Sequence, residues 1–195
     1  GEIVNNLPEN SHIKLLVVSN NDSEPSQTTK FTQMKKTVID EIKNIKFTGA
    51  PCLYNSMIEA FDSVTTSDIP LSARRAIVLI SDGNDQTSAT STTACSKTYG
   101  MNQVLEASTK NDIQIYTIPV QANGITLQDE FLRTLAGNSG GLYANDAKSV
   151  VDNATTVAGY LKGQILFAAN TICSSANSPD NAFHSATLYL KTKDG

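Results

Sequence analysis

The sequence contains no apolar stretch that approaches the roughly 20 residues a membrane-spanning helix needs. It also lacks a basic cluster, since 15 Lys and Arg residues stand against 19 Asp and Glu residues. This balance argues against a nucleic-acid-binding surface. No Walker loop, dinucleotide-binding fingerprint or zinc-type Cys and His spacing occurs. With 195 residues, 39% of them hydrophobic, the chain is long enough for one globular domain with its own core.

Cysteine is scarce, and its number leaves the cellular compartment open. Three cysteines suit either reduced thiols or one disulfide with a leftover thiol. The chain is rich in Ser, Thr and Asn and lean in Lys and Arg, which favours an extracellular protein. Asn21 and Asn153 each begin an Asn-x-Ser/Thr glycosylation pattern, although such short motifs also arise by chance. We therefore predict a secreted or cell-surface protein.

The apolar run at residues 76–80 is the most informative stretch, because it ends abruptly in Ser81, Asp82 and Gly83. A short apolar run without alternation predicts a strand buried on both faces, as in a parallel sheet covered by helices. Asp82 would then lie just past the carboxyl end of the strand, where open α/β sheets bind ligands. Gly83 would permit the sharp departure of the backbone. Taken alone, the Asp-Gly pair is equally typical of a simple turn.

Predicted strands and helices alternate along most of the chain. Strands are predicted at residues 12–19, 76–80, 113–120 and 141–144, and helices at 3–7, 32–45, 53–64, 101–110, 129–136 and 147–161. This order predicts an α/β, doubly wound domain with a mostly parallel sheet over residues 1–163. The alternation within 113–120 and its Pro119 place that strand nearer an edge. Residues 164–169 and 185–191 predict a C-terminal antiparallel strand pair, so 164–195 would extend the sheet or begin a β-rich appendage.

The segment from Gly137 to Gly141 matches the Gly-x-Ser-x-Gly pattern of a hydrolase nucleophile elbow. That elbow requires a strand before the serine and a helix after it, whereas here the predicted order is reversed. The pattern therefore favours a helix stop at Gly137. The two histidines, His12 and His184, each begin a predicted strand. We do not expect an enzyme.

Four stretches, in the same order as in the family, resemble the von Willebrand factor A-type (vWA) domain. The stretches are residues 13–20 (second strand), 49–57 (Gly-Ala-Pro-Cys-Leu-Tyr-Asn-Ser-Met, a loop and helix start), 76–85 (fourth strand with its Ser-Asp-Gly end) and 113–143 (closing strand, helix and strand). The C-terminal tail resembles the strands that follow this domain in secreted bacterial relatives. The resemblance implies a parallel sheet with a binding face at its carboxyl edge.

The resemblance also implies a metal-ion-dependent adhesion site, whose oxygen ligands suit Mg²⁺. Asp82 matches the aspartate that follows the family's fourth strand. The family's threonine position falls on Pro51, and Thr48 could reach the site only if the loop bends differently. The family's Asp-x-Ser-x-Ser motif does not occur. We therefore expect a degenerate site with weak Mg²⁺ binding by this chain alone.

The family's opening strand, which lies in the middle of the sheet, has no counterpart in the sequence. Leaving its place empty would expose unpaired backbone groups in the interior. We predict that another segment fills it: an upstream piece, a partner chain or the C-terminal strand. Alternatively, the 12–19 strand pairs directly with the 76–80 strand.

In the vWA arrangement the loops that carry Cys52 and Cys95 are neighbours. We therefore consider a disulfide between these cysteines, which would fit an oxidising compartment. The alternative is two buried free thiols.

Together these features predict a non-catalytic, adhesion-type vWA domain that binds a protein ligand through loops 20–29, 47–52 and 82–98. Asp82 would be its electrostatic anchor or metal ligand. Secondary candidates for metal or ligand contacts are Thr48, Asn84, Asp85, Gly49 and Asn20. The alternative is a scaffold domain of a larger surface or pilus-like assembly, without a ligand site and held by strand exchange.

Overall fold

The computed structural model describes residues 1–18, 30–45, 51–66, 68–69, 73–85, 95, 99–111, 113–121, 126–145 and 149–163. Its elements are α1 (Glu2–Asn6), α2 (Lys35–Lys43), α3 (Leu53–Thr65), β1 (Ala76–Ser81), α4 (Met101–Lys110), β2 (Gln114–Pro119), α5 (Asp129–Asn138), β3 (Leu142–Tyr143) and α6 (Val150–Gly163). The predicted antiparallel pair in 164–195 lies outside these ranges. It stays a prediction, as does the domain boundary between 163 and 164.

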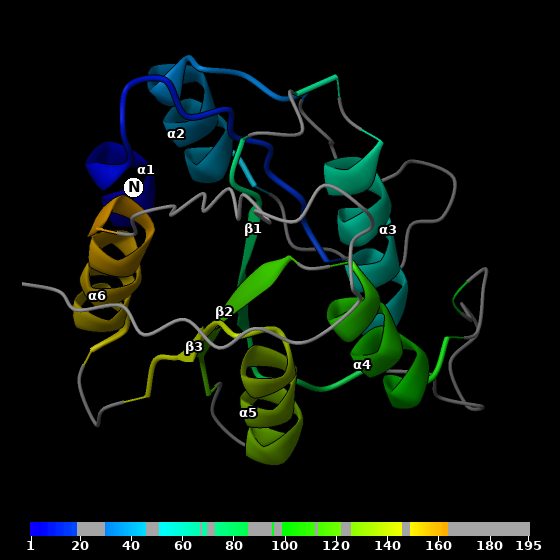
Figure 1. Ribbon diagram of the computed structural model, residues 1–195. Helices are drawn as coiled ribbons and strands as arrows, with labels where there is room; N and C mark the ends of the chain where they lie inside the picture. The colour runs from blue at the N-terminus through cyan, green and yellow to red at the C-terminus, as the bar shows by residue number, and fades with distance from the viewer. Residues whose placement is uncertain are drawn as a thin grey trace, which may run out of the picture. The chain divides into compact units, whose positions relative to one another are not determined.

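The three strands form a parallel sheet in the order β1-β2-β3. Successive side chains of the strands point to opposite faces. Ile77 and Leu79 of β1 and Ile115 of β2 pack against α3, α4 and α5, whereas Tyr116 and Ile118 of β2 pack on the side of α6 and α1. Figure 1 shows these two groups of helices on opposite sides of the sheet. The predicted α/β, doubly wound architecture is therefore confirmed.

The prediction that residues 113–120 lie near a sheet edge was wrong. In the described sheet β2 is the middle strand, and its residues Ile115 and Ile118 are completely buried. Pro119 is compatible with this place because it is the last residue of β2 and β3 pairs only with Tyr116 and Thr117. The sheet therefore loses no hydrogen bond through the missing N–H of Pro119.

The predicted strand at residues 12–19 is not a strand in the described range 12–18. A single antiparallel bridge joins Ile13 to Thr32, with N···O distances of 2.8 and 2.9 Å. Lys14 Nζ donates to Ser63 Oγ at 2.8 Å, which ties the segment to α3 rather than to the sheet. A strand needs a neighbour's ladder to satisfy its backbone, and this segment does not pair with β1. The alternative in which it pairs directly with the 76–80 strand is therefore wrong for these residues.

Helix α5 continues to Asn138, two residues beyond the predicted end at Ala136. The helix ends in a Schellman motif, in which Gly140 N–H donates to Gly137 O (3.2 Å) and Gly141 N–H donates to Ala136 O (3.0 Å). Gly140 has a φ of 67°, the left-handed conformation that this motif requires. The sequence pattern found the correct glycine-rich stop but placed the turn at the wrong glycine.

Candidate functional site

The loop that leaves β1 forms a tight turn held by its own side chains. Ser81 Oγ accepts the N–H of Gly83, and Asp82 Oδ1 accepts the N–H of Asn84, both at 3.0 Å. Gly83 has a φ of 78°, and a Cβ there would lie only 2.9 Å from the main-chain oxygen of Gln128. The predicted turn at Gly83 is therefore a close approach that only glycine allows.

This turn is joined to the segment that precedes α5. The N–H of Gln128 donates to Asp82 O at 2.8 Å, and Asn84 Nδ2 donates to Thr126 O at 2.6 Å. Asn84 thus uses its amide group to hold two loops together. Asp82 is half-buried, and its Oδ2 has no hydrogen-bond partner within the described ranges. We call the surface formed by Asp82, Asn84 and Thr126 the rim.

Asp85 lies against the first turn of α3 instead of projecting from the loop. Its Oδ1 accepts the N–H of Tyr54 at 3.1 Å, while its Oδ2 is buried and has no partner among the described residues. Burial raises the pKa of the Asp85 carboxyl, and the N–H groups of Tyr54 and Leu53 act in the opposite direction. Burial and the Asp85 charge also raise the pKa of Tyr54. Asp85 therefore caps α3 from 31 positions away in the sequence.

A disulfide between Cys52 and Cys95 confirms the predicted pairing, with a Cα–Cα distance of 5.9 Å. Cys52 is the residue immediately before α3 and is buried. The disulfide and the Asp85 cap therefore both attach the segment after β1 to the amino end of α3. This double attachment fixes the edge of the sheet at which Asp82 lies.

The described donors alone do not form a Mg²⁺ site. No group of three or more His, Cys, Asp or Glu residues suited to a metal occurs in the part of the chain that the structure describes. One carboxylate oxygen, Asp82 Oδ2, lies at the rim without a hydrogen-bond partner there, and Mg²⁺ prefers a near-octahedral set of oxygens. Thr48, Gly49 and Asn20, the other predicted site residues, lie outside the described ranges.

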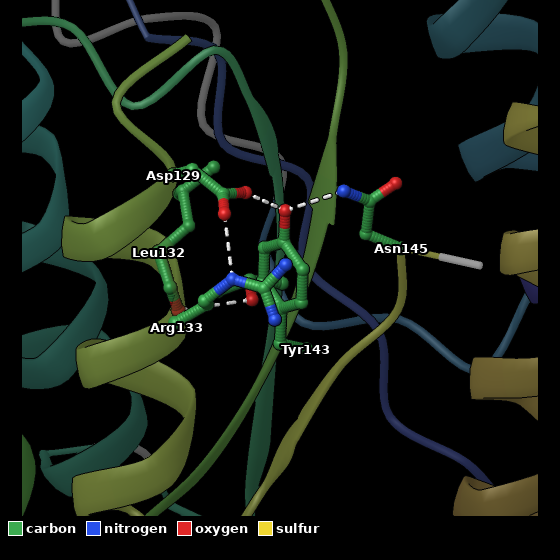
Figure 2. Close-up of polar contacts among 6 residues, drawn as sticks. Asp129, Leu132, Arg133, Tyr143 and Asn145 are labelled. Carbon is green, nitrogen blue, oxygen red and sulfur yellow. Dashed lines mark hydrogen bonds and ion pairs between the residues drawn. The ribbon is translucent and has the colours of Figure 1, made fainter. Parts of the chain in front are cut away.

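A second polar cluster, which sequence reasoning missed, joins α5 to β3 (Figure 2). Arg133 Nε donates to Asp129 Oδ2 at 2.6 Å, and the guanidinium lies 4.1 Å from the centre of the Tyr143 ring. Tyr143 donates its hydroxyl to Asp129 Oδ1 and accepts from Asn145 Nδ2 at 2.8 Å. The sequence carried one signal of this cluster, since Asp129 and Arg133 are four residues apart on a predicted helix. The contact with Tyr143 depends on the tertiary structure.

The structure also bears on the glycosylation pattern at Asn153 and on membrane-spanning helices. Asn153, the second glycosylation acceptor, is only 4% exposed in α6, so the folded domain does not offer it for modification. Asn153 therefore gives no support to an extracellular location. The helices that the structure describes include none with the length and apolarity to cross a membrane.

No protein-family model and no curated protein matches this chain. Solved structures do resemble it. An aerotolerance-related membrane protein from Bacteroides fragilis, carrying multiple mutations to serine, is similar with a TM-score of 0.56 and 15% identity over 82% of this chain and 81% of that one. The conserved hypothetical protein BatB from Bacteroides thetaiotaomicron is similar with a TM-score of 0.51 and 15% identity over 80% and 83%.

A third similar structure is described as von Willebrand factor type A, from Catenulispora acidiphila. Its TM-score is 0.58 at 13% identity, and the match covers 82% of this chain but only 36% of that chain. At such identities the likeness shows the fold alone. The layers of helices, the parallel sheet and the turn after β1 define a doubly wound α/β domain. Its fold is of the von Willebrand factor A type.

Proposed function

We propose that this domain is a non-catalytic, adhesion-type module that binds a protein ligand at the rim, with Asp82 as its electrostatic anchor. The observation that supports the proposal is the state of the Asp82 carboxylate. Asp82 is half-buried as a residue, its Oδ1 accepts the Asn84 N–H, and its Oδ2 has no hydrogen-bond partner among the described residues. A fixed, partly desolvated charge at the carboxyl edge of a parallel sheet is well suited to a cationic or metal-bridged contact.

Mg²⁺ would reinforce this contact if residues outside the described ranges complete the ligand set. Thr48 is the predicted second ligand, and the site is degenerate because the Asp-x-Ser-x-Ser element does not occur in the sequence. Metal binding would therefore be weaker than in a full oxygen cage.

A secreted or cell-surface location is part of the same proposal. It is supported by the Cys52–Cys95 disulfide, because disulfides persist in oxidising compartments and are rare in the cytosol.

Calorimetric titration with Mg²⁺ and Mn²⁺ tests the metal-dependent form of the rim. We expect binding that is lost in Asp82→Ala, weakened in Thr48→Ala and retained in Asp62→Ala, a control that removes an exposed carboxylate from α3. Loss of binding in Asp62→Ala as well would show a nonspecific charge effect. A wild-type domain that binds neither ion would favour the scaffold alternative, in which the domain has no ligand site of its own.

A further inference from the structure

The residue that begins α3 is one half of the disulfide. Cys52 is the N-cap of α3, is only 1% exposed and makes no side-chain hydrogen bond to the helix, and its sulfur is bonded to Cys95. The N–H groups and the dipole at a helix amino end stabilise a thiolate, which lowers the pKa of a cysteine placed there. The position of Cys52 on α3 would therefore, by itself, make its sulfur a good leaving group in thiol–disulfide exchange.

The Asp85 carboxylate lies at the same end of α3. Its Oδ1 accepts the N–H of Tyr54 at 3.1 Å, a bond that the side chain of an N-cap residue ordinarily makes. Its Oδ2 is buried and has no hydrogen-bond partner among the described residues, and none of the ion pairs between described residues includes Asp85. The amino end of α3 therefore carries a partly desolvated negative charge without a described cation to neutralise it.

The effect of this charge on a neighbouring acid is already visible at Tyr54, because the Asp85 charge contributes to raising the pKa of the Tyr54 hydroxyl. Cys52 is two positions before Tyr54, at the end of the helix that Asp85 caps. A thiolate formed at Cys52 would meet the same repulsion. It would also find the Tyr54 N–H already used by Asp85.

The two cysteines of the disulfide differ in exposure. Cys52 is buried, whereas Cys95 is partly exposed. A thiolate from solvent therefore reaches the Cys95 sulfur more readily, and Cys52 is the leaving group. The charge of Asp85 thus acts on the sulfur that has to leave as an anion.

We propose that the Asp85 carboxylate controls the redox reactivity of the Cys52–Cys95 bond and protects it from dithiol reductants. In the reaction, one thiolate of the dithiol bonds to the Cys95 sulfur while the S–S bond breaks, and Cys52 leaves with the electron pair. The second thiolate of the reductant then displaces Cys95. The dithiol is oxidised to a disulfide, and its two protons end on the two cysteines. The bond opens slowly while Asp85 caps α3 and readily once that charge is removed.

A role of Asp85 in capping alone predicts a different result. Asparagine is as good a capping residue as aspartate, because its side-chain oxygen accepts the same N–H, but it carries no charge. Asp85→Asn therefore keeps the cap on α3 and removes the repulsion. If Asp85 only caps the helix, this variant should not change the reactivity of the disulfide.

Reduction of the whole chain by dithiothreitol at about pH 8, where a dithiol is partly ionised, tests the proposal. N-ethylmaleimide first blocks free thiols, and peptide mass spectrometry then follows the new thiols at Cys52 and Cys95 after acid quenching and alkylation. We expect Asp85→Asn to be reduced at least about tenfold faster than wild type. Asp62→Asn, which removes an exposed carboxylate from the same helix, should be reduced at the wild-type rate.

Two further measurements separate the charge effect from a loosened helix. The N–H of Ser56 donates to Cys52 O at 3.0 Å, so its amide hydrogen exchange reports opening of the first turn of α3. This exchange should be the same in Asp85→Asn and wild type. In the wild-type protein, 2-mercaptoethanol should form its mixed disulfide with Cys95.

The proposal fails if Asp85→Asn and wild type are reduced at equal rates. It also fails if the reduction rate rises only in proportion to Ser56 exchange, because the variant would then act by opening α3. A mixed disulfide on Cys52 would show that Cys95 is the leaving group, away from the Asp85 charge. This last result uses the wild-type protein, so it holds even if Asp85→Asn does not fold. None of these measurements involves Mg²⁺ or a ligand of the rim.

Discussion

Replacing Gly141 by alanine should destabilise the domain severely, because the backbone of β3 lies against β2 at this point. A Cβ on Gly141 would lie 1.9 Å from the main-chain oxygen of Ile115 and 2.6 Å from its carbonyl carbon. The neighbouring atoms belong to backbone, so a side-chain rotation cannot relieve the clash. Restoring even a 3.0 Å contact requires β3 to move away from β2 by about 1.1 Å.

That movement would break the bonds that hold β3 and the turn between α5 and β3 against β2. Ala144 N–H donates to Thr117 O at 2.8 Å, and Ile115 N–H donates to Ser139 Oγ at 2.9 Å. Each bond contributes about 1 kcal/mol net, and overpacking adds about 1–3 kcal/mol. The expected loss is therefore about 3–5 kcal/mol, a large share of the roughly 5–15 kcal/mol that stabilises an ordinary domain.

Urea unfolding, followed by circular dichroism, measures this loss, and two neighbouring glycines provide matched controls. Gly137 is inside α5 with open space where a Cβ would be, so Gly137→Ala should stabilise by up to about 1 kcal/mol. Gly140 also has open space but a φ of 67°, so Gly140→Ala should cost about 1–2 kcal/mol through backbone strain alone. A Gly141→Ala protein as stable as the Gly140→Ala protein would refute the reasoning.

Three further predictions follow from the site. Burial raises the pKa of the Asp85 carboxyl above 3.8, so the folded state binds this proton more tightly than the unfolded state, and the free energy of unfolding falls as the pH rises between the two pKa values. Asp85→Asn does not titrate and should therefore gain stability relative to wild type across that pH range. A difference in unfolding free energy that does not change with pH would contradict this. The Cys52–Cys95 disulfide spans 43 positions, so the double variant Cys52→Ser/Cys95→Ser should lose about 4 kcal/mol of unfolding free energy in denaturant. Alkylation of the unreduced wild-type protein should label one thiol, that of Cys173, whereas three labelled thiols would show that the bond is absent. Tyr143→Phe should lower the free energy of unfolding by about 1 kcal/mol, because it removes the hydroxyl bond to Asp129 but keeps the ring under Arg133. A double-mutant cycle with Asp129→Asn should give a coupling energy above about 0.5 kcal/mol. Additive effects of the two substitutions would exclude the bond.

The helices show how far local patterns determine structure. The helices predicted at 53–64 and 101–110 agree with α3 and α4 to within one residue at each end. Their apolar residues recur at helical spacing, and such a pattern is recognised from residues only three or four positions apart in the sequence. The apolar run at 76–80 likewise predicts β1, and the polar residues that follow it predict the turn at Gly83.

Asp85 shows what local patterns leave out. In the sequence it is one more polar residue of a loop, and we predicted a ligand contact for it. In the structure it caps a helix that begins 32 residues earlier in the chain, at Leu53. No spacing rule within a loop contains this contact, because it depends on how β1 and α3 pack.

The sequence alone determined the identity of most elements, the parallel α/β class and the edge of the sheet at which Asp82 lies. These properties follow from hydrophobic periodicity and turn chemistry, which act over a few residues. Only the tertiary structure decided that β2 is the middle strand of the described sheet, that residues 12–18 do not pair with β1, and that Arg133 lies over Tyr143. Strand order and side-chain pairs of this kind depend on how the helices and strands pack against one another. The contacts that stabilise this packing join residues that are far apart in the chain.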